Sequence, residues 1–115
     1  MTRGCASEGQ RQVGTSGADR AEVHALMATL KARVQVEAPA GQREEAVRLI
    51  DELEDAILAE APNVRRMAFI RDWFSAHVPR LAGAVSELIL SPLVGRIVRA
   101  AGDLAAAEFR NAFAP

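Results

Sequence analysis

The sequence predicts an all-α protein, an antiparallel bundle of four to five helices behind a disordered, flexible N-terminal tail. From Asp19 onward, apolar residues recur at helical spacing in one segment after another. Proline and glycine stand between these segments, where turns are expected. The chain has no tyrosine, no alternating run of β-branched residues and no Asn-Gly or Asp-Gly hairpin turn, so nothing in it predicts a strand.

The first helix is predicted to start at Asp19 and to end before Pro39, because the residue before a proline avoids the helical conformation. Asp19 and Glu22 resemble a capping box at its start. Pro39, Ala40 and Gly41 form the connection to the next helix. The apolar stripe of the first helix consists of Val23, Leu26, Met27, Leu30 and Val34.

The second helix is predicted over residues 42–60, with Glu44 and Glu45 in the first turn, where carboxylates complement the helix dipole. Its stripe consists of Ala46, Val47, Ile50, Leu53, Ile57 and Leu58. A turn at Pro62-Asn63 precedes a third helix over residues 64–78. The residues that this helix turns inward are Val64, Met67, Ile70, Phe74 and Val78.

Beyond Pro79 the chain is rich in alanine and aliphatic residues, and Ser91-Pro92 is its clearest punctuation. Serine as N-cap followed by proline in the first turn is a common way to begin a helix. The sequence therefore predicts a fourth helix over residues 80–90 and a fifth over 92–111. An alternative breaks the fifth helix at Gly102, with Asp103 capping a short last helix that runs to Phe113.

Residues 1–18 contain four glycines and no apolar run, so we interpret them as a flexible tail rather than a targeting signal. Residues 19–113 then make up a single helical domain. The single cysteine, Cys5, allows no intrachain disulfide and suits a reducing compartment, so we expect a cytoplasmic protein. Cys5 and His24 supply at most half of a zinc site, so no metal is expected.

Charge is distributed unevenly between the second and third helices. Residues 43–60 contain seven carboxylates and two arginines, whereas residues 64–80 contain four arginines and one aspartate. Two interpretations are possible: the charges form solvated faces that help the two helices lie antiparallel, or they form a surface that steers a partner. We favour the first. The net charge of the chain is -1, so the arginines beside the aromatic residues of the third helix predict no direct nucleic-acid binding.

The sequence contains no motif of a known catalytic class, neither Gly-x-Ser-x-Gly, nor a phosphate-binding loop, nor Gly-x-Gly-x-x-Gly. No Glu-x-x-His pair of a di-iron bundle is present. Ser75 and His77 would project about 200° apart on a helix, which separates a nucleophile from its base. We therefore expect no enzyme activity and no cofactor.

Two sets of apolar residues are candidates for binding another protein. Phe69 and Trp73 are i, i+4 neighbours at the edge of the third helix, rotated away from its inward stripe. We expect Trp73→Ala to weaken association but to leave the stability of the isolated chain nearly unchanged. The apolar C-terminal half predicts association with a second copy, a homodimer. The interface candidates in this half are Leu81, Val85, Leu88, Leu93, Val94 and Ile97.

An alternative reading is a membrane-interacting protein in which residues 81–101 insert as a hairpin or lie in the interface, with Arg96 and Arg99 at the headgroups. The stretch has about the length of a span. Glu87, the two arginines and the Ser-Pro break lie inside it, however, and argue against a single spanning helix.

The run LVGRIVRAAGDLAAAEFRNAF, preceded by an acidic and an arginine-rich helix, resembles small helical modules of actinobacterial conflict and signalling proteins. Residues 91–95, Ser-Pro-Leu-Val-Gly, are its most distinctive piece, and the resemblance covers residues 20–113. It implies a bacterial, non-enzymatic adaptor that joins sensors to effectors through like-with-like association. Such modules have no catalytic residues to carry over, and the effector would here be a separate protein.

Overall fold

The computed structural model describes residues 17–113, and every element in this range is helical. The all-α prediction is therefore confirmed. The predicted tail, with Cys5, lies outside the described residues except for Gly17 and Ala18, which belong to the first helix. In chain order the elements are α1 (Gly17–Glu37), the 3₁₀ turn η2 (Ala40–Gln42), α2 (Arg43–Leu58), α3 (Val64–His77), α4 (Pro79–Ile89), α5 (Pro92–Ala101) and α6 (Asp103–Phe113).

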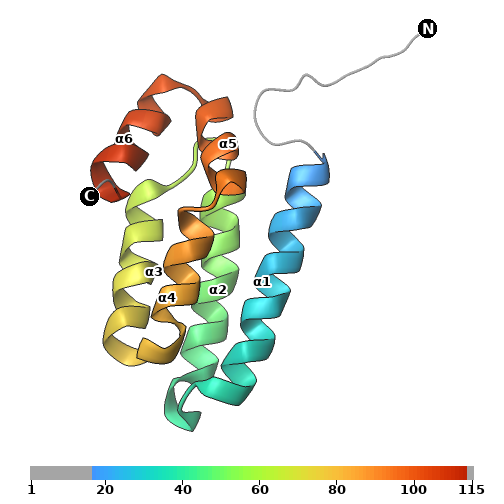
Figure 1. Cartoon of the computed structure of the whole chain (residues 1–115), viewed down its shortest axis with the longest axis vertical. Helices are drawn as coiled ribbons and strands as arrows, with labels where there is room; N and C mark the ends of the chain where they lie inside the picture. The colour runs from blue at the N-terminus through green and yellow to red at the C-terminus, as the bar shows by residue number, and fades with distance from the viewer. Residues whose placement is uncertain (1–16, 114–115) are drawn as a thin grey trace, which may run out of the picture.

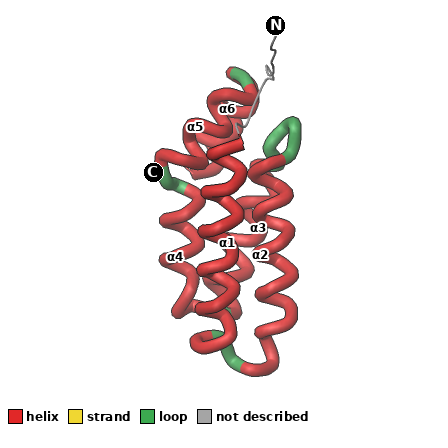
Figure 2. Tube along the Cα trace, turned by 90° about the vertical axis from the view of Figure 1, so that its right-hand side faces the viewer, coloured by secondary structure: helices red, strands yellow, loops and turns green. Residues whose placement is uncertain are grey.

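The first four α-helices form an up-and-down bundle in which α2 and α4 each lie between α1 and α3 (Figure 1). The short connections between them make successive helices antiparallel, as predicted. α5 continues beyond α4 with a bend of 51° and contacts α1 and α2, and α6 turns back to lie on α3. Figure 2 shows α5 and α6 together at one end of the four-helix bundle.

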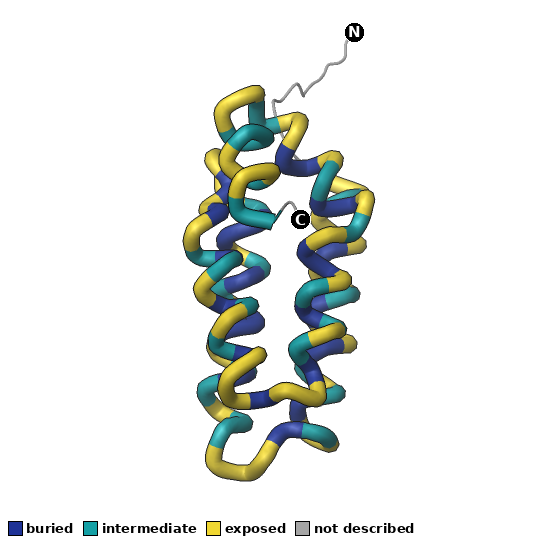
Figure 3. Tube along the Cα trace, turned by 60° about the vertical axis from the view of Figure 1, so that its left-hand side comes forward, coloured by how far each residue is buried: buried dark blue, intermediate teal, exposed yellow. Residues whose placement is uncertain are grey.

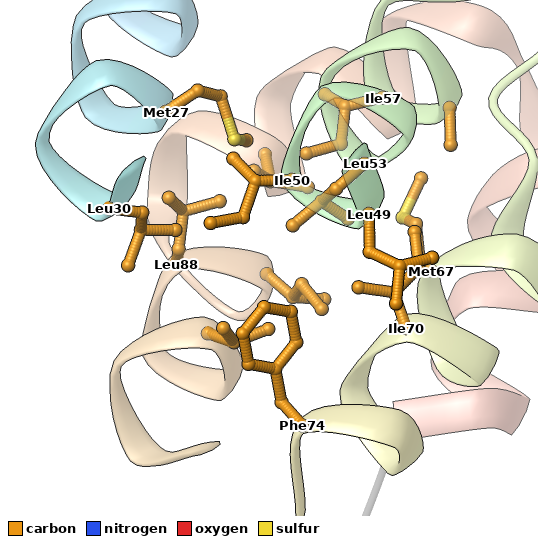
Figure 4. Packing of buried hydrophobic residues seen from close by; sticks show 14 of the residues in the cluster. Met27, Leu30, Leu49, Ile50, Leu53, Ile57, Met67, Ile70, Phe74 and Leu88 are labelled. Carbon is orange, nitrogen blue, oxygen red and sulfur yellow. The ribbon is translucent and has the colours of Figure 1, made fainter. Parts of the chain in front are cut away.

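The core lies between the four bundle helices, and Figure 4 shows side chains from each of them meeting there. Buried positions follow the inner side of every bundle helix (Figure 3). The buried face of α2 is rotated toward α3 relative to the predicted stripe. Leu49 and Ala56 are buried, whereas Val47 and Leu58 are only partly buried. The largest fully buried side chains are Phe74, Met27, Leu49, Ile50, Leu53, Ile57, Met67, Ile70, Leu81 and Ile89.

Two predicted helix starts are confirmed by side-chain caps. The Asn63 side chain accepts a hydrogen bond from the backbone N–H of Arg66 at 3.0 Å and caps α3. The Ser91 hydroxyl accepts one from the backbone N–H of Val94 at 3.4 Å and caps α5, with Pro92 in the first turn. Each cap satisfies a backbone donor that has no partner inside its helix.

Three predictions about helix ends are wrong. The described part of α1 begins at Gly17, so Asp19 lies inside the helix and not at the predicted cap position. Its carboxylate instead lies 3.1 Å from the guanidinium of Arg96 in α5. The continuous fifth helix is also wrong, because the chain turns at Gly102, where φ is +129°. The alternative with a break at this position is correct, and α6 follows as a separate helix. Asp103 lies in the first turn of α6 rather than at the cap position before it, because the first hydrogen bond of the helix joins the N–H of Ala106 to the carbonyl of Gly102.

We predict that Phe74→Ala destabilises the protein by about 3–5 kcal/mol, because the substitution removes a ring that is completely buried between the bundle helices. Urea denaturation followed by circular dichroism measures the change. Phe69→Ala is a matched control in the same helix, since half of that ring is exposed. Equal losses of stability in the two variants would contradict the assignment of Phe74 to the core.

Candidate interaction surface

Six of the eight predicted interface residues lie in the interior of the single chain. Their positions in α4 and α5 face α1, α2 and α3, so the chain's own helices cover the apolar half that we expected a second copy to cover. Sequence periodicity identified the apolar face correctly but did not show what covers it. An apolar stripe has the same spacing whether it packs inside one chain or against a second copy. The residues corrected in this way are Leu81, Val85, Leu88, Leu93, Val94 and Ile97.

The other two residues, Phe69 and Trp73, lie on the outer flank of α3 that borders α2. Half of the Phe69 side chain is exposed, and Trp73 is partly buried at the edge of the core. Both are rotated away from the buried stripe of α3, as the spacing predicted. We call Arg66, Phe69, Trp73 and His77, which follow one another along this flank, the aromatic face.

The indole of Trp73 is held by its neighbours. It stacks on the His77 ring, with centroids 4.7 Å apart and an angle of 18° between the planes, and meets Phe74 edge-on at 5.2 Å. The Nδ1 atom of His77 lies 3.0 Å from the backbone carbonyl oxygen of Trp73 and donates to it near the end of α3. The His77 side chain therefore contacts the backbone near the C-terminal end of this helix.

Phe69 is held by Arg66, whose guanidinium carbon lies 5.1 Å from the centre of the ring. Arg66 is fixed in turn by α2, because its Nη2 atom lies 2.7 Å from Oε1 of Glu52. This oxygen is buried and makes no hydrogen bond of good geometry, so the contact is an ion pair rather than an aligned bond. Glu52 also pairs with Arg48 on its own helix.

An open cleft of about 240 Å³ adjoins the aromatic face, between the end of α2 and the start of α3. Arg66 belongs to both features, since it lines the cleft and covers Phe69. The cleft combines carboxylates, an amide and a guanidinium with two alanines, a composition suited to polar contacts at the edge of a binding surface. The lining residues are Glu52, Asp55, Ala56, Ala59, Asn63 and Arg66.

Three carboxylates of α2 pair with basic side chains of its two neighbours, α1 and α3. Lys31 of α1 lies 2.6 Å from Asp51, and His24 of α1 lies 3.0 Å from Glu54. On the other side, Arg66 of α3 pairs with Glu52. One ion pair of opposite charges therefore joins α2 to α3, which supports the interpretation that these charges help the two helices to lie together.

Two further ion pairs lie within single helices and shift the pKa values of their members. A hydrogen bond from Arg48 lowers the pKa of Glu45, and one from Arg33 lowers the pKa of Glu37. The same bonds raise the pKa of each arginine. All four groups are solvated, so these pairs define the charge pattern of the outer surface and add little to stability.

Within residues 17–113, no three His, Cys, Asp or Glu side chains come together as a metal site would require. No helix in that range is by itself long and apolar enough to cross a bilayer. α4 and α5 meet the length and composition criteria only as a pair, across their 51° bend.

Comparisons with known protein families, curated proteins and solved structures found no match to this chain. The resemblance to helical modules of actinobacterial proteins therefore stays a prediction.

We predict that Trp73→Ala destabilises the chain by about 1–3 kcal/mol, because the indole loses ring contacts with Phe74 and His77 that are worth about 0.5–1.5 kcal/mol each. This replaces the expectation of nearly unchanged stability, since Trp73 packs against the core. Urea denaturation measures the change, with Ser75→Ala at an exposed position of α3 as control. A variant as stable as the control, or one unfolded at room temperature, would contradict the half-buried position.

Proposed function

We propose that this chain is a non-enzymatic protein-interaction module that presents the aromatic face of α3 to another protein. The observation that carries the proposal is the half-exposed ring of Phe69 on a helix that the core holds rigidly. Aromatic and arginine side chains together dominate the binding energy of protein interfaces. Here Phe69, Trp73 and Arg66 occupy one helix flank within two turns.

The aromatic face is organised before any partner arrives. Arg66 is held by the ion pair with Glu52, and the Trp73 indole is held by His77 and Phe74. Side chains that are already ordered lose little rotamer freedom on binding, so more of the contact energy remains as affinity. This arrangement favours a stable docking site over an incidental exposed ring.

The surroundings of Phe69 indicate the chemistry of the partner. An apolar side chain would cover the ring, and a basic or hydrogen-bonding group would reach the adjoining cleft, where Asp55 is exposed. Such a surface has an aromatic centre and a polar rim, the usual anatomy of a protein interface. It fits the side of a partner helix or an extended segment, since the face follows the axis of α3.

A membrane-interacting role for residues 81–101 is the alternative proposal, supported by the joint length and composition of α4 and α5. The large apolar side chains within α4 and α5 are buried in the bundle, and only Leu90 between the two helices is exposed, so extensive lipid contact requires the bundle to open first. Co-sedimentation with anionic liposomes separates the two proposals, because only the membrane role predicts pelleting that depends on lipid.

We predict that Phe69→Asp weakens binding of a protein captured by the chain from an extract of its native cells by about 30-fold, the equivalent of about 2 kcal/mol. The captured protein is purified and titrated into each variant, and emission of Trp73, the single tryptophan, reports the binding. Trp73 lies on the same face as Phe69, so its emission should change on binding.

The matched control is Val36→Asp, which changes another exposed apolar residue, 80% accessible at the end of α1. We expect it to bind like the unmodified chain. A partner that binds both variants equally well, or that leaves Trp73 emission unchanged, would place the binding site elsewhere and refute the proposed role of the aromatic face.

A further inference from the structure

α5 and α6 carry one apolar pattern that continues across the break between them. On a straight helix at 100° per residue, Leu104 of α6 would lie within about 20° of Ile97 and Leu93 of α5. Glu108 is the one charged residue that falls inside this stripe. The apolar positions of the combined stripe are Leu93, Val94, Ile97, Val98, Ala101, Leu104, Ala105, Phe109 and Ala112.

In the bent arrangement α6 is the least buried α-helix of the described chain. Each of the other five contains at least four buried residues, whereas α6 contains none (Figure 3). It rests on α3 through partly buried side chains, and Arg71 of α3 lies 4.9 Å from the centre of the Phe113 ring. Leu104 is 80% exposed, so the bend removes it from the stripe to which it belongs by spacing.

A single residue connects the two helices. Gly102 adopts φ +129° and ψ 172°, a conformation essentially restricted to glycine. Its N–H donates to the carbonyl of Arg99, and its own carbonyl accepts from the N–H of Ala106, both at 3.1 Å. Nothing lies within 4 Å of the position that a side chain at Gly102 would take, so the backbone conformation alone distinguishes this residue. Straightening would therefore change mainly one residue and would restore regular helical hydrogen bonds there.

We propose that α5 and α6 can straighten into one helix over Pro92–Phe113 and that two copies of the chain then exchange α6, each docking on α3 of the other. The site on α3 fits this occupant because α6 already fills it in the single chain. A straight helix of this length, about 33 Å, carries α6 away from its own α3 and leaves that site empty. Reciprocal exchange fills both sites and forms a closed two-fold dimer.

The exchange does not rest on the proposed function. Arg71, which contacts α6, and Phe69, at the centre of the aromatic face, are about 200° apart on α3, so they lie on opposite flanks. The aromatic face would remain accessible in the exchanged dimer. An experiment that contradicts the exchange of α6 therefore leaves the proposed role of the aromatic face untouched, and the reverse also holds.

The first experiment is Gly102→Ala, analysed by light scattering at micromolar concentration. Alanine disfavours the positive φ of the bend and favours a helix, so we expect the dimerisation constant to rise at least ten-fold, with the mass moving from 12.3 kDa to twice that value. Gly83→Ala is the matched control. It makes the same change at an exposed helical position of α4 with open space around it, and we expect no change in mass. A folded, strictly monomeric Gly102→Ala protein would overturn the proposal.

The second experiment tests whether α6 is the exchanged element. Two preparations, both with Cys5→Ser, carry either Arg71→Cys or Phe113→Cys, and they are incubated together and treated with a short thiol cross-linker. Because residues 71 and 113 meet where α6 docks, we expect mixed cross-linked dimers well above those formed with Val36→Cys in place of Arg71→Cys. The cross-linking is measured with glycine and with alanine at position 102. It therefore tests the exchange of α6 even if the alanine variant does not fold. If no cross-linked dimer of the Arg71→Cys and Phe113→Cys chains forms, even when the alanine variant is dimeric, the proposed exchange of α6 is wrong.

Discussion

The burial of the inner face of α2 is the contact on which the rest of the structure depends. α2 contributes six buried residues, more than any other helix of the described chain, and it touches α1, α3 and α5. Its position between α1 and α3 fixes the rotation of α3, because Met67, Ile70 and Phe74 must face the same core. Once α3 is oriented in this way, Phe69 has to point outward, since it lies on the opposite side of the helix from Met67. The exposed ring is thus a consequence of how the core is packed.

Charge and hydrophobic burial have different roles in this arrangement. Solvated ion pairs contribute about 0–1 kcal/mol each, whereas a buried aliphatic side chain contributes about 1.5–3 kcal/mol. The core therefore supplies the stability, and the pairs of α2 with α1 and α3 add selectivity for these neighbours. The Arg66–Glu52 pair also has a local effect, because it holds a guanidinium over Phe69. The packing of the core leaves Phe69 exposed, and this ion pair, although of modest strength, orders the side chains around the ring.

The sequence was sufficient to predict the helices and the inward side of α3, because apolar spacing, Asn63 and Ser91-Pro92 act locally. It also separated Phe69 and Trp73 from the core stripe, since helix geometry alone sets that rotation. It misplaced residues such as Leu81 and Val94, whose burial depends on which helix lies opposite. Tertiary packing across many residues determines which helix lies opposite, and the apolar stripe of one segment does not indicate which helix packs against it. The bend was left open for a related reason, because the stripe continues through Gly102 while the glycine permits a turn.

Gly102 illustrates how a helix pattern and a backbone conformation can favour different structures. The periodicity of residues 92–113 favours one helix, and the docking of Phe109 and Phe113 near α3 favours two. In the single chain the two helices are separate, α6 packs on α3 with both rings partly buried, and Leu104 is exposed. When a second α3 is available, the same rings can be covered without the bend. The balance between the two forms then depends on protein concentration, because one is reached within a chain and the other only between chains. Since neither form needs the aromatic face, α3 can bind along one flank while α6 occupies the other.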